Sequence, residues 1–201
     1  MTTSTSKAVR IALYGHISAT PAALRRELEA RGVFVQDNDG DPADIDCAIF
    51  AVNPSAGIDG ETIAHWERLN DYLTPRIFVA LALPGTDLDF DDAVLLGNRV
   101  LDQLVTPYLV LHADDGTPAA LISLADLTVR NYVAGMAVIS ESESEHRELV
   151  SDFQKEYIEA ISQAGDDAFS AGMLFPAIPI NIDSGIGLDV LISYLDQLAE
   201  E

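Results

Sequence analysis

The sequence has little positive charge. Its 201 residues include 11 lysines and arginines against 33 acidic residues, which gives a formal net charge of −22, and Lys7 and Lys155 are the only lysines. Because proteins bind nucleic acids through cationic side chains that displace counterions, this balance argues against direct binding of DNA or RNA outside a small patch such as Arg25 and Arg26. It is typical of a strongly hydrated, acidic surface.

Cysteine and long apolar runs are also scarce. Cys47 is the single cysteine, which excludes an intrachain disulfide, and its apolar neighbours predict a small core residue. The first seven residues, MTTSTSK, lack the apolar segment of a signal peptide, and no stretch is long and apolar enough to cross a bilayer. We therefore expect a cytoplasmic protein with no membrane partner.

Familiar catalytic motifs are missing. The four histidines, at positions 16, 65, 112 and 146, do not pair at the spacing of metal ligands. The sequence has no Gly-x-Ser-x-Gly motif, so a serine hydrolase has no support. We expect no catalytic residue and no cofactor.

Alternating strand-like and helix-like segments fill the first half of the chain. Expected strands are AVRIALY (8–14), VFVQD (33–37), DCAIFAVN (46–53) and RIFVALAL (76–83), and expected helices are 21–32, 61–73 and 91–104. Pro21 suits a first helical position and Gly32 a helix end. This alternation predicts an α/β fold, a mostly parallel sheet with a layer of helices on each face.

The pattern changes after residue 107. YLVLHADDGTPAALISLADLTVRNY predicts antiparallel strands joined by tight turns, and the acidic run that follows becomes an amphipathic helix ending near residue 163. A last strand is expected at 177–182 and a closing helix at 187–201. We expect a flexible N-terminus (1–7) and a single domain (8–201), in which residues 108–172 form a small β-rich insertion before the last strand.

The order of these segments resembles the G domain of the translational GTPases, and elongation factor G and the ribosomal-protection proteins in particular. GHISATPAA (15–23) stands where that family has AHIDAGKTT, and DCAIFAVNPSAGIDGETIAHWERLNDYLTPRIFVA (46–80) matches its strand, Gly-Val turn and Trp-bearing helix. The hairpin region and the segment HRELVSDFQKEYIEAI (146–161) match the insertion and the helix before the last strand. The resemblance covers most of residues 8–198 and implies a P-loop GTPase fold.

The residues that would bind GTP depart from the family pattern. Gly15 is kept, but Thr20 replaces the glycine that lets the loop wrap a phosphate, Pro21 replaces the phosphate-binding lysine, and Ala22 replaces the magnesium-binding Ser or Thr. The guanine-reading Asn-Lys-x-Asp would fall on Leu-Ala-Leu-Pro (81–84), and the Ser-Ala loop near residues 181–182. The expected helix ends at Gly32 and the next expected strand begins at Val33, which leaves no room for the family's first switch loop. The resemblance thus implies degenerate GTP binding.

One acidic segment invites two other interpretations. Asp37 and Gly40 fit the family's Asp-x-x-Gly motif, although Asp41 replaces its catalytic histidine. Asp37, Asp39 and Asp41 also fit the third, fifth and seventh positions of a calcium loop, but Val35 would take the first ligand position and no helix leads in. An acidic turn between two strands explains the segment better than a calcium loop, and we expect no metal site.

The short link from VFVQD to the next strand also predicts an interface. Only eight residues, 38–45, separate the two expected strands, whereas parallel strands are usually joined by a dozen or more, often including a helix. Without that helix a sheet face and a strand edge would stay open. We therefore expect Val33, Val35, Ile45 and Ile49 to form a surface for self-association or for a protein partner.

Three functional interpretations remain open. The first is an elongation-factor-G-like domain that has lost GTP binding and hydrolysis and serves as a protein-interaction or regulatory module. The second is a binding protein or enzyme for a small molecule or nucleotide that reuses the cleft at the carboxyl ends of the strands. The third is a translation-factor relative with weak residual GTP binding.

Overall fold

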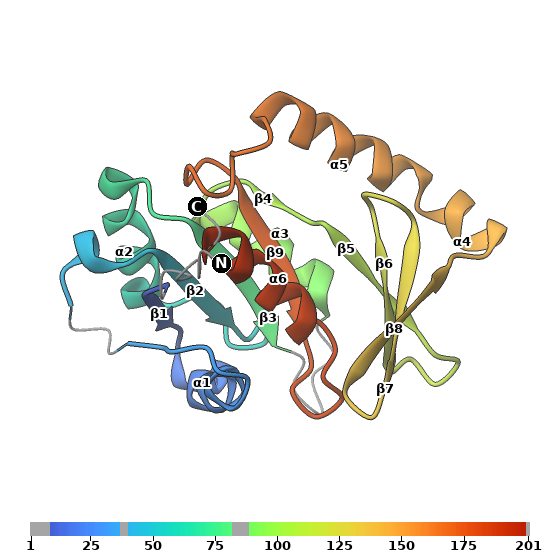
Figure 1. Ribbon diagram of the computed structural model, residues 1–201, viewed down its shortest axis with the longest axis horizontal. Coiled ribbons are helices and arrows are strands. Elements are labelled where there is room, and N and C mark those ends of the chain that lie inside the picture. The colour runs from blue at the N-terminus through green and yellow to red at the C-terminus, as the bar shows by residue number, and fades with distance from the viewer. Residues whose placement is uncertain (1–8, 37–39, 82–88, 200–201) are drawn as a thin grey trace, which may run out of the picture.

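The chain folds into an α/β structure with two separate sheets (Figure 1). A computed structural model describes residues 9–36, 40–81 and 89–199. The first sheet is parallel and has five strands, and the second is antiparallel and has four. The prediction of a mostly parallel sheet with a β-rich segment before the last strand is therefore confirmed.

The parallel sheet has the strand order β1-β2-β3-β9-β4. Its strands are β1 (Ile11–Tyr14), β2 (Cys47–Val52), β3 (Arg76–Leu81), β9 (Phe175–Ile180) and β4 (Leu104–Val105). Every residue of β1, β2, β3 and β9 is buried, as expected for strands covered on both faces. The continuous apolar runs in the sequence reflect this double burial.

Two pairs of helices cover the two faces of this sheet. Helices α1 (Pro21–Ala30) and α6 (Leu188–Ala199) pack on one face through buried leucines such as Leu24 and Leu191, and Figure 1 shows α6 in front of the strands. Helices α2 (Gly60–Arg68) and α3 (Phe90–Val100) pack on the other face, where Trp66 and Phe90 enter the core.

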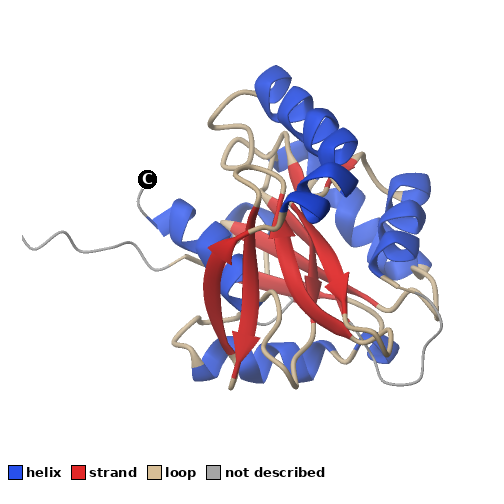
Figure 2. Ribbon diagram, turned by 90° about the vertical axis from the view of Figure 1, so that its right-hand side faces the viewer, coloured by secondary structure: helices blue, strands red, loops and turns tan. Residues whose placement is uncertain are grey.

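The antiparallel sheet is a meander with the order β5-β6-β7-β8, whose strands are labelled in Figure 1. Figure 2 shows the molecule from the side on which this sheet lies, with the strands in red. Its strands are β5 (Tyr108–His112), β6 (Pro118–Ser123), β7 (Thr128–Val133) and β8 (Met136–Glu141). Two helices follow, α4 (Ser144–Leu149) and α5 (Ser151–Ala164), and Val150 and Tyr157 pack against buried residues of the meander. The whole segment lies between β4 and β9 in the chain.

Several expected elements differ in extent. The strand expected at 33–37 is reduced to one parallel bridge between Val35 and Ile11, and the helix expected at 61–73 ends at Arg68. Leu73 adopts a left-handed φ of 49°, which a continuous α-helix cannot contain. Ser140 and Glu141 belong to β8 rather than to a solvated run, because they pair with β7. The short β4 was not expected.

Three short 3₁₀ helices complete the described chain: η1 (Ile17–Ala19), η2 (Pro42–Asp44) and η3 (Asn70–Tyr72). The expected flexible segment 1–7 lies outside the described residues. None of the helices that the structure describes has the length and apolar character needed to cross a membrane.

Candidate functional site

The loop after β1 closes on itself through its own backbone. The N–H of Ala19 donates to His16 O at 2.9 Å, and the N–H of Thr20 donates to Ile17 O at 3.0 Å. The N–H of Ser18 is bonded to Nδ1 of the His16 side chain at 3.2 Å. Three consecutive amides, at the positions where a phosphate loop presents its donors, are therefore occupied within the chain.

The start of α1 continues this arrangement. Thr20 sits in the left-handed region with φ 46°, and Pro21, the first residue of α1, has no N–H to offer. Ala22 is exposed and carries no oxygen that could bind magnesium. The substituted positions of the expected phosphate loop thus stand together at one helix start, where none supplies a positive charge and Ala22 supplies no magnesium ligand.

The loop is also fixed against the next strand. Gly15 adopts φ 148°, and a Cβ there would overlap the carbonyl oxygen of Ala51 on β2. Asn53, just beyond β2, donates from Nδ2 to Ser18 O at 3.1 Å, and Ala19 is fully buried. The loop therefore packs directly on the neighbouring strand, in a conformation that its own contacts maintain.

The other expected nucleotide positions that the structure describes contribute to packing or to their own loop. Leu81 ends β3 and is buried, and residues 82–84 lie outside the described residues. The side chain of Asn181 caps its own loop, because its Oδ1 accepts from the N–H groups of Asp183 at 3.0 Å and Ser184 at 3.1 Å. Ile182 is partly buried against the core.

The acidic segment is described only in part. Asp37 and Asp39 lie outside the described residues, and Gly40 is exposed. Asp41 caps the 3₁₀ helix η2 by accepting from the N–H of Ala43 at 3.0 Å. Within the ranges that the structure describes, no group of three or more His, Cys, Asp or Glu side chains could hold a metal ion.

The expected interface residues are mostly inside the fold. Val35, Ile45 and Ile49 are buried, and Val33 is partly buried. The prediction that Val35, Ile45 and Ile49 form an exposed surface is therefore wrong. Helix α1 covers the sheet face beside Val35 and Ile49 with its buried leucines, so the missing crossover helix leaves no gap there.

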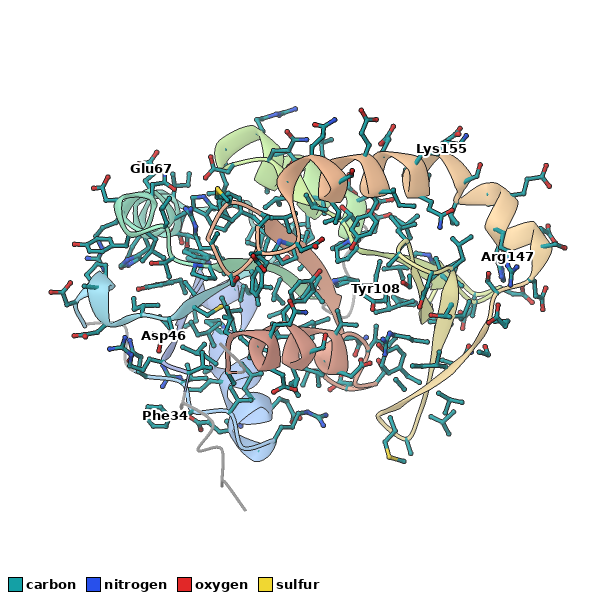
Figure 3. All side chains as sticks on the ribbon, turned by 45° about the horizontal axis from the view of Figure 1, so that its top comes forward. Phe34, Asp46, Glu67, Tyr108, Arg147 and Lys155 are labelled. Atoms are coloured by element: carbon teal, nitrogen blue, oxygen red, sulfur yellow. The ribbon has the colours of Figure 1, made fainter. Side chains whose placement is uncertain are left out.

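The segment around Val35 is also held at its edge. Arg25 of α1 donates to the carbonyl oxygens of Val35 and Gln36, at 3.0 Å in each case. Phe34 is the residue of this segment that faces solvent, with 70% of its surface exposed (Figure 3).

A polar cluster ties the antiparallel sheet to α6, and no pattern in the sequence pointed to it. Tyr132 of β7 donates to Asp189 at 2.7 Å, and Arg130 forms an ion pair with the same carboxylate at 2.8 Å. The N–H of Gly187 donates to the Tyr132 hydroxyl at 3.1 Å. Burial raises the pKa of Tyr132, so the hydroxyl keeps its proton and remains a donor.

A buried arginine was likewise missed. Arg76 of β3 is 1% exposed and donates to Trp66 O at 3.0 Å and to Asn70 Oδ1 at 2.5 Å. Its guanidinium carbon lies 4.3 Å from the ring centre of Phe175 and 4.8 Å from that of Trp66. Burial lowers the pKa of Arg76, and Asp102 at 3.8 Å opposes that effect. These contacts belong to the packed core beneath α2.

An open groove of about 470 Å³ lies between α3 and α5. Leu95 and Phe153 form part of its walls and are 62% and 54% exposed. Asp91 and Glu156 add carboxylates, and the pKa of Asp91 is raised by burial and by the neighbouring Asp89 and Asp92. The lining of the groove thus combines apolar side chains with carboxylates.

Comparison with curated proteins finds relatives of this sequence. The chain is 22% identical over 166 residues to a curated elongation factor G-like protein, present in two strains of Mycobacterium tuberculosis, and the match covers 71% of this chain. The chain is similar to elongation-factor-G-like proteins. It spans only about a fifth of their length, since the match covers 22% of each relative. No protein-family model matches the sequence.

A solved structure shares the fold. A crystal structure of a protein from Thermus thermophilus superimposes with a TM-score of 0.75 and 19% sequence identity, covering 96% of this chain and 40% of the other. At this identity the likeness shows the fold alone. The match extends over both sheets, because little of the chain is left outside it.

Proposed function

We propose that this chain is an elongation-factor-G-like GTPase-fold domain that neither binds nor hydrolyses GTP and acts as a protein-interaction or regulatory module. The observation that carries the proposal is the closed loop after β1. Its amides at Ser18, Ala19 and Thr20 are already bonded within the chain, and Pro21 has none. A phosphate at this position would find no free backbone N–H among these residues.

Electrostatics support the same conclusion. A triphosphate needs a lysine and a magnesium ion to compensate its charge, and Pro21 and Ala22 stand where the family has the residues that supply both. The net charge of −22 adds long-range repulsion against a nucleotide or a nucleic acid. Leu81 cannot read a guanine edge, because its buried side chain has no polar atom.

Exposed apolar groups support the interaction role. Leu95 and Phe153 expose more than half of their surface at the groove, and Met136 and Val138 do so on β8. Large apolar side chains grouped on the surface of a soluble domain mark contacts with other proteins. The groove and β8 both lie away from the loop after β1 (Figure 1). A partner protein bound at either of them would not need a nucleotide in that loop.

One observation favours a second candidate, a small-molecule binding protein. The groove of about 470 Å³ falls within the usual range for ligand sites, roughly 300–1,000 Å³. It lies between α3 and α5, not at the carboxyl ends of β1, β2 and β3, where the sequence alone suggested a cleft.

A thermal-shift screen distinguishes these functions. The protein is heated with GTP, GDP or ATP, each with magnesium, and with a metabolite panel. A ligand at 100 times its Kd stabilises a protein by about 2.7 kcal/mol, which shifts the melting temperature by several degrees. The proposal predicts no shift with any nucleotide. A shift of several degrees with GTP contradicts it and supports residual GTP binding.

If a metabolite shifts the melting temperature, two variants show whether it binds in the groove. Leu95→Glu places a charge on the groove wall, and Leu149→Glu places the same charge on α4, where the leucine is 69% exposed and does not line the groove. A shift that Leu95→Glu removes and Leu149→Glu keeps supports the small-molecule candidate.

A further inference from the structure

The outer edge of β8 is the feature that carries a further inference. β8 pairs with β7 on one side and ends the order of its sheet. In Figure 1 this hairpin lies at the side of the molecule away from the N-terminal strands. Strand edges of this kind present rows of N–H and C=O groups that another strand can pair with.

The hairpin turn fixes which backbone groups face outward. β7 and β8 are joined by Ala134 and Gly135, whose φ values of 51° and 78° fit a two-residue type I′ turn. In such a hairpin the flanking pair, Val133 and Met136, is hydrogen-bonded, and bonded pairs alternate with non-bonded ones along the ladder. Val138 therefore bonds to β7.

The alternation turns the N–H and C=O groups of Ala137, Ile139 and Glu141 away from β7. Within the described chain, no backbone hydrogen bond outside the hairpin involves these three residues. The outward groups recur every second residue, about 6.8 Å apart, which is the repeat of an extended strand. The edge thus fits an extended segment rather than a helix.

The side chains of β8 do not protect this edge. Met136 is 69% exposed, Val138 53% and Ile139 56%, and they lie on both faces of the strand. Charged side chains and proline usually protect an exposed edge, and residues 136–140 include neither, so that Glu141 at the end of β8 is its charged residue. Apolar side chains on both faces can cover the side chains of an added strand.

The surroundings of β8 are acidic. Glu141, Glu143 and Glu145 are exposed at the end of the strand and the start of α4. Arg147, labelled in Figure 3, is the arginine of that helix and pairs with Glu141 at 2.7 Å. A second copy of this chain would bring another net charge of −22, whereas a basic segment would bring the opposite sign.

We propose that the outer edge of β8 binds an extended, basic segment of a partner protein, which adds a strand to the antiparallel sheet. The backbone groups of Ala137, Ile139 and Glu141 provide the hydrogen bonds, and the acidic residues beyond β8 select positive charge. This inference rests on the proposed protein-interaction function and names the chemistry of the partner.

Fluorescence anisotropy with two synthetic peptides tests the proposal. One peptide alternates lysine and valine over seven residues, and the other replaces each lysine by glutamate. We expect the basic peptide to bind with a Kd that rises as salt is added, and the acidic peptide to bind at least tenfold more weakly.

Two variants locate the binding at the edge. Ile139→Pro removes an outward N–H without removing a hydrogen bond to β7, and Ile139→Ala removes the side chain but keeps that N–H. We expect Ile139→Pro to lose at least tenfold in affinity and Ile139→Ala to stay within about threefold of wild type. Far-UV circular dichroism and the melting temperature check that both variants are folded.

Four outcomes would overturn the proposal. They are no binding of the basic peptide up to millimolar concentration, equal binding of the acidic peptide, unchanged binding by a folded Ile139→Pro, and a wild-type dimer in light scattering that Ile139→Pro dissociates. The last result assigns the edge to a second copy. These four outcomes concern only the edge of β8. Failure of the proposed function would appear instead as GTP binding in the nucleotide screen, so the two failures can be told apart.

Discussion

At the scale of single residues, Gly15 and Arg76 each make a close packing contact with the parallel sheet or its helices. Gly15 lets the loop after β1 lie directly on the backbone of Ala51. Arg76 fills the space between Trp66 and Phe175 on the face under α2 and α3. Each can be tested with one substitution and a matched control.

Gly15→Ala is expected to destabilise the protein by about 2 kcal/mol, because its φ of 148° is strained for alanine and the new Cβ would overlap Ala51 O. Gly60→Ala is the control, since Gly60 begins α2 and a Cβ there meets no atom within 4 Å. We expect that control to stay within about 1 kcal/mol of wild type. Urea unfolding measures both, and equal midpoints for the two variants would contradict the described loop.

Arg76→Ala is expected to cost about 3 kcal/mol or more, because it leaves a cavity and removes the donor from Trp66 O and Asn70. Arg76→Met should cost less, since it refills the space without a charge. Arg99→Ala, at an exposed position near the end of α3, is the control and should change stability by less than about 0.5 kcal/mol. A loss below about 1 kcal/mol for Arg76→Ala would show that the arginine does not organise this core.

At the scale of elements, the helix starts are set by side chains that the sequence displays. Asp59 accepts from the N–H of Thr62 at 2.7 Å at the start of α2, and Asp89 and Asp92 form a capping box at the start of α3. The hydrogen bond from the Thr62 N–H lowers the pKa of Asp59 in the folded protein.

Asp59→Ala should destabilise the protein by about 1 kcal/mol at pH 7. A carboxylate whose folded pKa is lowered stabilises the fold above its unfolded pKa, about 3.9, and this contribution is lost as pH falls through the folded pKa. The difference from wild type should therefore shrink below about pH 4. Asp166→Ala, at an exposed turn, is the control, and an Asp59→Ala difference that stays constant from pH 7 to pH 3 would rule out this role.

The elements that periodicity specifies were predictable, and those that depend on tertiary pairing were not. The buried runs of β2, β3 and β9 and the helix start at Pro21 follow from composition and local chemistry. The two-residue strand β4 exists because it pairs with β9, which no local pattern encodes. β8 extends to Glu141 because the type I′ turn sets its register with β7.

The candidate sites likewise include features that the sequence predicts and features that only the fold determines. The substitutions at Thr20, Pro21 and Ala22 are visible in the sequence, but the hydrogen bonds that close the loop are not. The interface prediction failed for Val35 and Ile49 because it assumed an uncovered sheet face, whereas α1 covers it. Arg130, Tyr132 and Asp189 come from distant parts of the chain, so only the fold brings them together.

At the scale of the whole molecule, packing and the polar cluster of Arg130, Tyr132 and Asp189 hold the two sheets together. Leu121 of the meander is fully buried in the same core as Ile49 and Leu191, and Asp189 of α6 accepts from Arg130 and Tyr132 of β7. The chain is thus similar to elongation-factor-G-like proteins, and it carries a net charge of −22 and a loop after β1 whose amides are bonded within the chain.

Isothermal titration calorimetry with GTP and magnesium measures directly whether the protein binds this nucleotide. The protein at about 100 μM is titrated with GTP at near-physiological salt, and a triple variant, Thr20→Gly, Pro21→Lys and Ala22→Thr, is titrated alongside to show whether the loop alone prevents binding. Because the loop amides are bonded internally and the lysine and magnesium ligand are replaced, we predict no binding heat for the wild type. A wild-type dissociation constant in the micromolar range would contradict that claim.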